Sequence, residues 1–405
     1  MERKDVPQNL KWKTTDIFES DEAWEAEFKA VESEYGAYDF DVFKGKLADK
    51  KTLLEYLTLD DTLSLRIEKL YLYAHMRQDE DVRVAKYSSC MAMMGGMISK
   101  IFARLSFVEP ELTTIDENVL KQYIADPDFA PYEYRLRRVL VSKAHVLSEA
   151  EEKILTLGGD ALGGFRTIFS MLDNANLNLP KAMLNGEETQ MSHGTYGLGL
   201  HTGTVEERAD WFKKYYEAYI KLIDAITQTY YGNVKKNVFY KTVRNYESCK
   251  AKAMEGEDVS PVVYDNLLNA VHNAQSTMHR YIRLHRDTLG LPEQHMYDLY
   301  VPLVDNAEIK LPFDEAYELV IEGLAPLGKD YQALLRKGKE EGWIDVCETE
   351  GKRSGAYSTS AYGIHPYVLL NYQPTTNDMF TIAHEMGHAL HSYKSSETQP
   401  YAKAS

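Results

Sequence analysis

Near its last residues the chain reads Phe380-Thr-Ile-Ala-His384-Glu385-Met386-Gly387-His388-Ala-Leu-His391. On an α-helix, residues four positions apart share a face, so His384 and His388 can present two imidazole nitrogens to one metal ion. Glu385 follows one position later, so its carboxylate lies beside the metal rather than on it. The stretch therefore predicts a helix that carries two metal ligands and an adjacent carboxylate.

The pattern H-E-x-x-H is the signature of zinc metallopeptidases. In that signature the two histidines bind zinc and the glutamate is the general base for a metal-bound water. A helix is also favoured by the residues around the motif. Thr375 and Asp378 stand in a T-x-x-D capping relation just after Pro374. Apolar residues recur at helical spacing and predict a buried stripe, formed by Met379, Ala383, Met386 and Leu390.

The motif has a plainer interpretation. The chain has 12 His among 405 residues, and with that content H-E-x-x-H arises by chance in roughly a few per cent of sequences. The two histidines and the glutamate would then lie on the solvated face of an ordinary helix. The remaining sequence has to decide between these interpretations.

Composition excludes several classes of protein. With 405 residues, 44% of them hydrophobic, the chain is long enough for two or three domains with a substantial core. Its formal net charge of −16 argues against nucleic acid or an anionic membrane as the main partner. No apolar run approaches 18 residues and no leader is apparent, so we expect neither secretion nor membrane insertion. The cysteines, Cys90, Cys249 and Cys347, lack C-x-x-C spacing, which favours a reducing compartment and excludes zinc held by thiolates.

Helical patterns dominate most of the chain. From Tyr87 to Leu105 apolar residues follow helical spacing, which predicts a helix. This helix is expected to stop at Glu109-Pro110. The pair Gly95-Gly96 within it indicates a close helix contact or a kink. Thr204-Val-Glu-Glu207 is a capping box before a further helix. Ser260-Pro261 predicts the start of a long helix that ends at Gly290.

Three short segments read as strands. Asn185-Gly186 between Met183 and Glu188 predicts a β-hairpin. Gly351 to Ser358 and Tyr367 to Tyr372 are extended segments that directly precede the H-E-x-x-H helix. A strand edge there could hold a peptide through main-chain hydrogen bonds. The alternative is an ordinary two-stranded cover over the helix.

Several of these motifs occur in an order that resembles one family. The order is Gly-Trp343-Ile-Asp, then Gly-Lys-Arg-Ser-Gly-Ala-Tyr357, then Pro366-Tyr-Val-Leu-Leu-Asn-Tyr372, then His-Glu-Met-Gly-His-Ala-Leu-His391. It resembles oligoendopeptidase F, in the thimet oligopeptidase superfamily. The resemblance extends to Leu10-Lys-Trp12-Lys-Thr-Thr-Asp-Ile-Phe18, to residues 135–152 and to residues 289–300, and so covers essentially the whole chain.

The resemblance implies a fold and an activity. The fold class would be mainly α, a multi-helix oligopeptidase with a small β-sheet beside the H-E-x-x-H helix and a deep channel that admits short peptides. Three regions are expected: an N-terminal helical region at 1–110, an oligopeptidase F N-terminal-type domain at 111–200, and a catalytic metallopeptidase domain at 201–405. Such proteins are cytoplasmic zinc endopeptidases that act on short peptides.

The resemblance also implies roles for particular residues. His384 and His388 would bind one zinc ion, and Glu385 would activate the water. His391 matches an additional histidine of the family and is expected to support the site without binding zinc. Gly355, Ala356 and Tyr357 would border the substrate cleft, an expectation that rests on their position alone.

The chain also departs from the family pattern. In this family the third zinc ligand is a glutamate on a later helix, and downstream tyrosine and histidine donors stabilise the oxyanion. The chain stops at Ser405, before such residues could occur, so we expect it to be incomplete at the C-terminus and a poor peptidase alone. The alternative function is a non-catalytic helical fragment that binds peptides or another chain.

Overall fold

The computed structural model describes residues 1–304 and 310–404. Residues 305–309, which belong to the predicted catalytic region 201–405, and Ser405 lie outside the described residues. The chain forms two compact units. The first unit comprises Met1–Thr167, Phe313–Tyr372 and Met379–Ser405, and the second comprises Ile168–Pro312 and Gln373–Asp378. The sequence regions 1–110, 111–200 and 201–405 stay a prediction.

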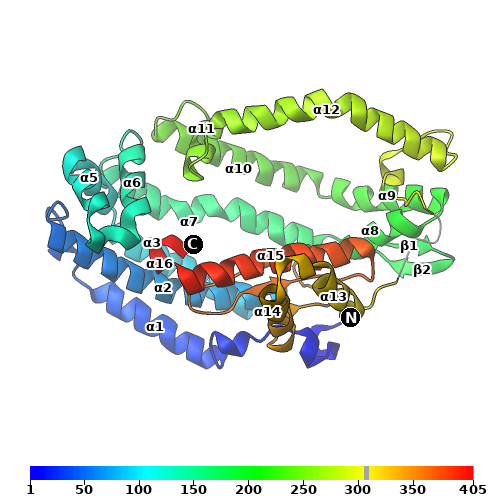
Figure 1. Ribbon diagram of the computed structural model, residues 1–405, viewed down its shortest axis with the longest axis horizontal. Helices are drawn as coiled ribbons and strands as arrows, with labels where there is room; N and C mark the ends of the chain where they lie inside the picture. Colours follow the sequence, from blue (N-terminus) through cyan, green and yellow to red (C-terminus); the bar gives the residue numbers. More distant parts are fainter. Residues whose placement is uncertain (305–309, 405) are drawn as a thin grey trace. The chain divides into compact units, whose positions relative to one another are not determined.

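Helices make up most of both units, which confirms the predicted mainly α fold class (Figure 1). The α-helices are α1 Asp21–Ala37, α2 Lys50–Glu80, α3 Ala85–Arg104, α4 Val108–Thr114, α5 Glu117–Ala125, α6 Glu133–Ser142, α7 Glu149–Met171, α8 His193–Thr202, α9 Val205–Ile220, α10 Ile223–Val243, α11 Cys249–Gly256, α12 Pro261–Thr288, α13 Phe313–Gly323, α14 Lys329–Glu340, α15 Thr376–Thr398 and α16 Tyr401–Ala404. Short 3-10 helices lie at Arg3–Asp5, Gln8–Leu10, Thr14–Asp16, Phe40–Val42, Pro127–Tyr132, Met296–Asp298 and Ala325–Leu327, and a π-helical turn at Leu172–Asn176.

The main core of the first unit lies among α1 to α6. Side chains from these helices form one hydrophobic cluster that includes Trp24, Phe28, Leu57, Leu70, Met94 and Phe129. The predicted helix around Tyr87 is α3, and its buried residues are on the expected face. A Cβ on Gly95 would lie 3.2 Å from Asp160 Oδ1, so the predicted close helix contact is present.

The predicted end of this helix at Glu109-Pro110 was wrong. Helix α3 ends at Arg104, and Pro110 lies in the first turn of α4. A proline is tolerated there because the first amides of a helix have no intrahelical partner.

By length and composition alone, the stretch Ala85–Thr114 could cross a membrane. Most of its buried residues, however, belong to the core cluster of the first unit.

A three-stranded sheet completes the first unit. The strands are β3 Ile344–Asp345, β4 Tyr357–Thr359 and β5 Tyr367–Leu369, in the order β3-β5-β4. Strand β5 is parallel to β3 and antiparallel to β4, with Val368 opposite both Ile344 and Ser358. The two predicted extended segments are therefore neighbouring strands. A small core of Trp12, Leu72, Met76, Ala361, Tyr367 and Leu369 packs against them.

The predicted hairpin lies in the second unit. Strands β1 Lys181–Leu184 and β2 Glu187–Gln190 pair antiparallel across Asn185 and Gly186, whose φ angles are 53° and 84°. Positive φ at both turn residues is what a two-residue type I′ turn requires. The capping box at Thr204 and Glu207 is present and starts α9. Trp211 of α9 is buried, and its Nε1 donates to Met183 O at 2.7 Å.

Helix α12, like much of α10, exposes large apolar side chains to solvent. It begins at the predicted Ser260-Pro261 cap and ends before Gly290, whose φ is 65°. Among its residues only His285 is buried. Large apolar side chains are solvent-exposed along much of its length: Val263, Tyr264, Leu267, Leu268, Val271, Met278, Tyr281 and Leu284.

Candidate metal centre

The H-E-x-x-H stretch lies on α15, and the predicted cap starts this helix. The Asp378 amide donates to Thr375 Oγ1 at 3.1 Å, and the Thr375 hydroxyl donates to Asp378 Oδ2 at 2.6 Å. The Gln373 amide donates to Asp378 Oδ1 at 3.1 Å, so both carboxylate oxygens accept hydrogen bonds. Burial raises the pKa of Asp378, and these hydrogen bonds oppose the rise.

One side of α15 is buried and fixes the rotation of the helix. Its buried apolar residues are Ile382, Met386, Ala389 and Leu390. Met386 and Leu390 therefore lie in the core as predicted, whereas Met379 and Ala383 are only partly buried. A Cβ on Gly338 of α14 would lie 3.0 Å from Met386 Cε and 2.9 Å from Trp343 Cε3. The absence of a side chain at Gly338 thus lets α14, α15 and the residue before β3 pack closely.

The opposite side of α15 carries the histidines. His384 and His388 are exposed, and their Nε2 atoms lie 3.1 Å apart. The ring planes are inclined by 82°, with centroids 4.7 Å apart. The structure therefore brings the two predicted ligands together, with the same ring nitrogen of each within hydrogen-bonding distance of the other.

This geometry suits a shared zinc ion. Zinc–nitrogen bonds of about 2.0–2.1 Å at a tetrahedral angle place two ligand nitrogens roughly 3.3 Å apart. The observed 3.1 Å is close to that value. The same distance also suits a hydrogen bond between a protonated and an unprotonated imidazole. Within residues 1–304 and 310–404 no group of three or more His, Cys, Asp or Glu could hold a metal ion, so the described residues offer no third partner beside the two predicted ligands.

Glu385 faces a different environment from the histidines. A step of one residue turns the helix by about 100°, and Glu385 is only 8% exposed although both of its neighbouring ligand candidates are exposed.

Glu397 is a poor candidate for a third ligand. It lies nine residues after His388, on the opposite side of the helix, and its carboxylate accepts a hydrogen bond from Lys394 Nζ at 2.9 Å.

The remaining predicted site residues lie around this helix and the sheet. His391 is exposed and lies seven residues after His384, on the same side of α15. Gly355 and Ala356 precede β4, and Tyr357 begins it. The Tyr357 hydroxyl donates to Asp79 Oδ2 at 2.8 Å, and burial raises the pKa of Tyr357. Any contact between a peptide and this segment would therefore use the backbone and not the tyrosine hydroxyl.

A buried ionic network, which no local pattern in the sequence indicates, lies beside the sheet. Asp345 of β3 is 1% exposed and accepts hydrogen bonds from Arg3 at 3.1 and 2.7 Å. Lys352 Nζ lies 2.7 Å from Asp345 Oδ1 and donates to Cys347 O at 2.7 Å and Leu370 O at 2.5 Å. Burial lowers the pKa of Lys352. These contacts join the N-terminal segment to the strands that precede α15.

Comparison with known proteins gives consistent matches along the chain. The model of peptidase family M3 matches residues 201–405, and a model described as oligopeptidase F matches residues 111–178. Oligopeptidase PepF of Bacillus subtilis is 37% identical over 403 residues, which are 99% of this chain and 60% of that protein. An oligoendopeptidase F homolog of Lactococcus lactis is 34% identical, over 98% of this chain and 67% of that protein.

A solved structure supports the same assignment. The crystal structure of oligoendopeptidase-F from Enterococcus faecium matches with a TM-score of 0.69 and 26% identity, over 93% of this chain and 64% of that chain. The chain thus spans 60% and 67% of the length of the two curated relatives described above.

Proposed function

The chain belongs to peptidase family M3, and from this membership we propose that it serves the zinc-dependent hydrolysis of internal peptide bonds in short peptides. The observation that carries the proposal is the pair of Nε2 atoms 3.1 Å apart on His384 and His388, with Glu385 at the next helical position. In this proposal the histidines hold the metal and Glu385 accepts the proton.

The chain's own residues would divide the work as follows. A bound zinc ion would lower the pKa of a coordinated water and polarise the carbonyl of the bond to be cleaved. Glu385, which is largely shielded from solvent, would take a proton during the attack and deliver it to the leaving amine. His391 would support the ligand helix from the same exposed side. This support is an expectation from position alone.

Strand β4 supports a proposal for substrate binding. It pairs with β5 on one side, and its other side takes part in no strand pairing among the described residues. An unpaired strand edge can bind an extended peptide through main-chain hydrogen bonds. We propose that Gly355, Ala356 and Tyr357 contribute backbone groups in this way, which would give broad tolerance of substrate side chains.

Cleavage of an internally quenched fluorogenic peptide tests the proposed chemistry. The chain is loaded with zinc, and the rate is compared with that of Glu385→Gln and of Glu397→Gln, a matched change on the opposite side of α15. General base catalysis typically contributes a factor of about 100 to 10,000. We therefore expect Glu385→Gln to lower kcat by at least about 100-fold, with zinc content unchanged, and Glu397→Gln to have little effect.

The absolute rate is expected to be low, because the described residues supply only two zinc ligands. The comparison among the three proteins is therefore made on kcat and zinc content together. Cleavage that persists in Glu385→Gln, or that resists a zinc chelator, would contradict the proposal.

A second candidate function is binding without catalysis. The exposed apolar side of α12 favours it, because a soluble protein rarely leaves so long an apolar stripe uncovered. In that case short peptides or another chain would bind, and no peptide would be cleaved. Peptide binding that is equal in the unchanged chain and in Glu385→Gln, without cleavage by either, would favour this second function.

A further inference from the structure

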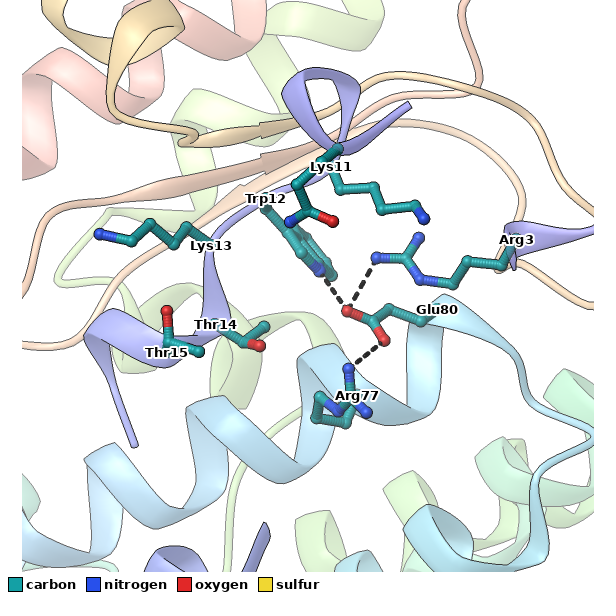
Figure 2. A pocket seen from close by; sticks show the side chains of 9 residues that line it. Arg3, Lys11, Trp12, Lys13, Thr14, Thr15, Arg77 and Glu80 are labelled. Atoms are coloured by element: carbon teal, nitrogen blue, oxygen red, sulfur yellow. Dashed lines mark hydrogen bonds and ion pairs between the residues drawn. The ribbon is translucent and has the colours of Figure 1, made fainter. Parts of the chain in front are cut away.

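A pocket of about 260 Å³ lies in the first unit, between the N-terminal segment and α2 (Figure 2). Four cationic side chains line it, Arg3, Lys11, Lys13 and Arg77, and Glu80 is the only acid among the lining residues. The whole chain carries a net charge of −16. Arg3 also pairs with Asp345, and Lys13 pairs with Asp16, so among the described residues that line the pocket Lys11 is the cation without a paired acid.

The carboxylate of Glu80 is already occupied. Its Oε1 accepts from Trp12 Nε1 at 2.7 Å and lies 2.8 Å from Arg3 Nη2, and its Oε2 accepts from Arg77 Nη1 at 2.7 Å. The residue is 5% exposed. Both oxygens of Glu80 are thus engaged by donors at the base of the pocket, and its negative charge is balanced there.

Other donors of the pocket remain unused. No hydrogen bond or ion pair between described residues involves Lys11 Nζ or the hydroxyls of Thr14 and Thr15. Arg77 Nε is buried without a hydrogen-bond partner, and Asp21 Oδ1 lies 3.9 Å from it. Figure 2 shows Lys11 and Arg3 extending toward the same space beside Glu80. Lys13 is not counted, because it pairs with Asp16 at 2.7 Å.

We propose that this pocket binds a phosphate group, either as inorganic phosphate or on a small phosphorylated molecule. Ammonium, guanidinium and hydroxyl groups that approach from several directions match the acceptor oxygens of a tetrahedral anion better than those of a planar carboxylate. The volume accommodates a small ligand rather than a peptide. The proposed peptidase chemistry uses none of these residues.

Binding would connect two parts of the first unit. Lys11, Thr14 and Thr15 belong to the N-terminal segment and Arg77 to α2, so an anion between them would link the segment to the helix. A ligand that binds only the folded state stabilises that state. The ligand would therefore raise the thermal stability of the first unit.

Isothermal titration and thermal unfolding of the full chain test the site, with inorganic phosphate as the probe at constant ionic strength. We expect a Kd below about 1 mM and a rise in the unfolding temperature. Lys11→Gln removes the unpaired ammonium and should weaken phosphate binding by at least about 10-fold. Lys4→Gln, an exposed lysine of the same segment that does not line the pocket, should bind phosphate like the unchanged chain.

Further arms identify the ligand class. Phosphoserine that binds more tightly than inorganic phosphate would assign an organic phosphate, and equal affinity would assign the free anion. The proposal is overturned if potassium chloride at the same ionic strength gives the same stabilisation, or if Lys11→Gln and Lys4→Gln bind phosphate equally. It is also overturned if citrate binds and phosphate does not. Circular dichroism of both variants checks that each is folded.

Discussion

Replacing Asp345 by asparagine should strongly destabilise the first unit. The substitution keeps the shape of the side chain and removes one negative charge. In the unchanged chain, Asp345 lies 2.7 Å from Lys352 Nζ and 2.7 Å from Arg3 Nη2. Arg3 retains Glu80 at 2.8 Å as a second partner. Lys352, whose side chain is fully buried, would retain only neutral partners.

The magnitude can be bounded from both sides. Removing one partner of a buried ion pair typically costs about 3–5 kcal/mol. The cost at pH 7 cannot greatly exceed that of deprotonating Lys352 instead. The ordinary lysine pKa of 10.5 lies about 3.5 pH units above 7, and each unit corresponds to about 1.36 kcal/mol, so this limit is about 5 kcal/mol. We therefore expect a loss of about 3–5 kcal/mol in the free energy of unfolding.

Urea-induced unfolding followed by tryptophan fluorescence measures the loss. Three of the four tryptophans, Trp12, Trp24 and Trp343, are buried in the first unit, so the signal reports mainly on that unit. Asp5→Asn is the matched control, because Asp5 is exposed and belongs to the same N-terminal segment.

A second measurement separates charge from shape. In Asp345→Asn the pKa of Lys352 is lower in the folded state than in the unfolded state. At pH values between these two pKa values, the unfolded state therefore binds more protons than the folded state does. Stability should therefore rise with pH, and the deficit should shrink when the pH is raised from about 7 to about 9. A deficit below about 1 kcal/mol, or one that does not change with pH, would refute the reasoning.

Three further predictions concern other parts of the chain. A Cβ on Gly199 would lie 2.5 Å from Trp211 Cδ2, whereas a Cβ on Gly197 would meet none of the described neighbouring atoms within 4 Å. Gly199→Ala should therefore lower the free energy of unfolding by about 1–3 kcal/mol, measured by thermal or chemical unfolding, and Gly197→Ala should not lower it. Leu267 and Val271 of α12 are 61% and 51% exposed, so the double change to aspartate should leave stability unaltered and reduce self-association in analytical ultracentrifugation, with Asn273→Asp as the control. Burial would raise the pKa of Asp345, but Lys352 and Arg3 outweigh burial and lower it. The folded carboxyl thus resists protonation, and acid unfolding below about pH 4 should be steeper in the unchanged chain than in Asp345→Asn.

Local signals were sufficient for much of the fold. The hairpin at Asn185-Gly186, the capping box at Thr204, the capping relation of Thr375 and Asp378, and the proline-marked start of α12 each depend on a few neighbouring residues, and each occurs as predicted. The end of α3 was misplaced because Pro110 is compatible with either the stop of one helix or the first turn of the next. Only the structure distinguishes these two cases.

Long-range contacts could not be read from the sequence. Arg3 is far from Asp345 and Lys352 in the chain, and no local period or spacing marks a buried ion pair. The pairing of His384 and His388 was predictable because helical spacing alone brings the two rings together. The exposure of α12 was not, because an amphipathic pattern shows which side of a helix is apolar and not whether another segment covers it.

Zinc content of the purified chain tests the central claim most directly. After the chain is loaded with zinc and passed over a desalting column, inductively coupled plasma mass spectrometry gives the metal bound per chain. The account predicts zinc bound to the unchanged chain and to His279→Ala, an exposed histidine of α12, and its loss from the double variant His384→Ala, His388→Ala. Equal zinc in all three proteins, or none in any of them, would contradict the assignment of these two histidines as metal ligands.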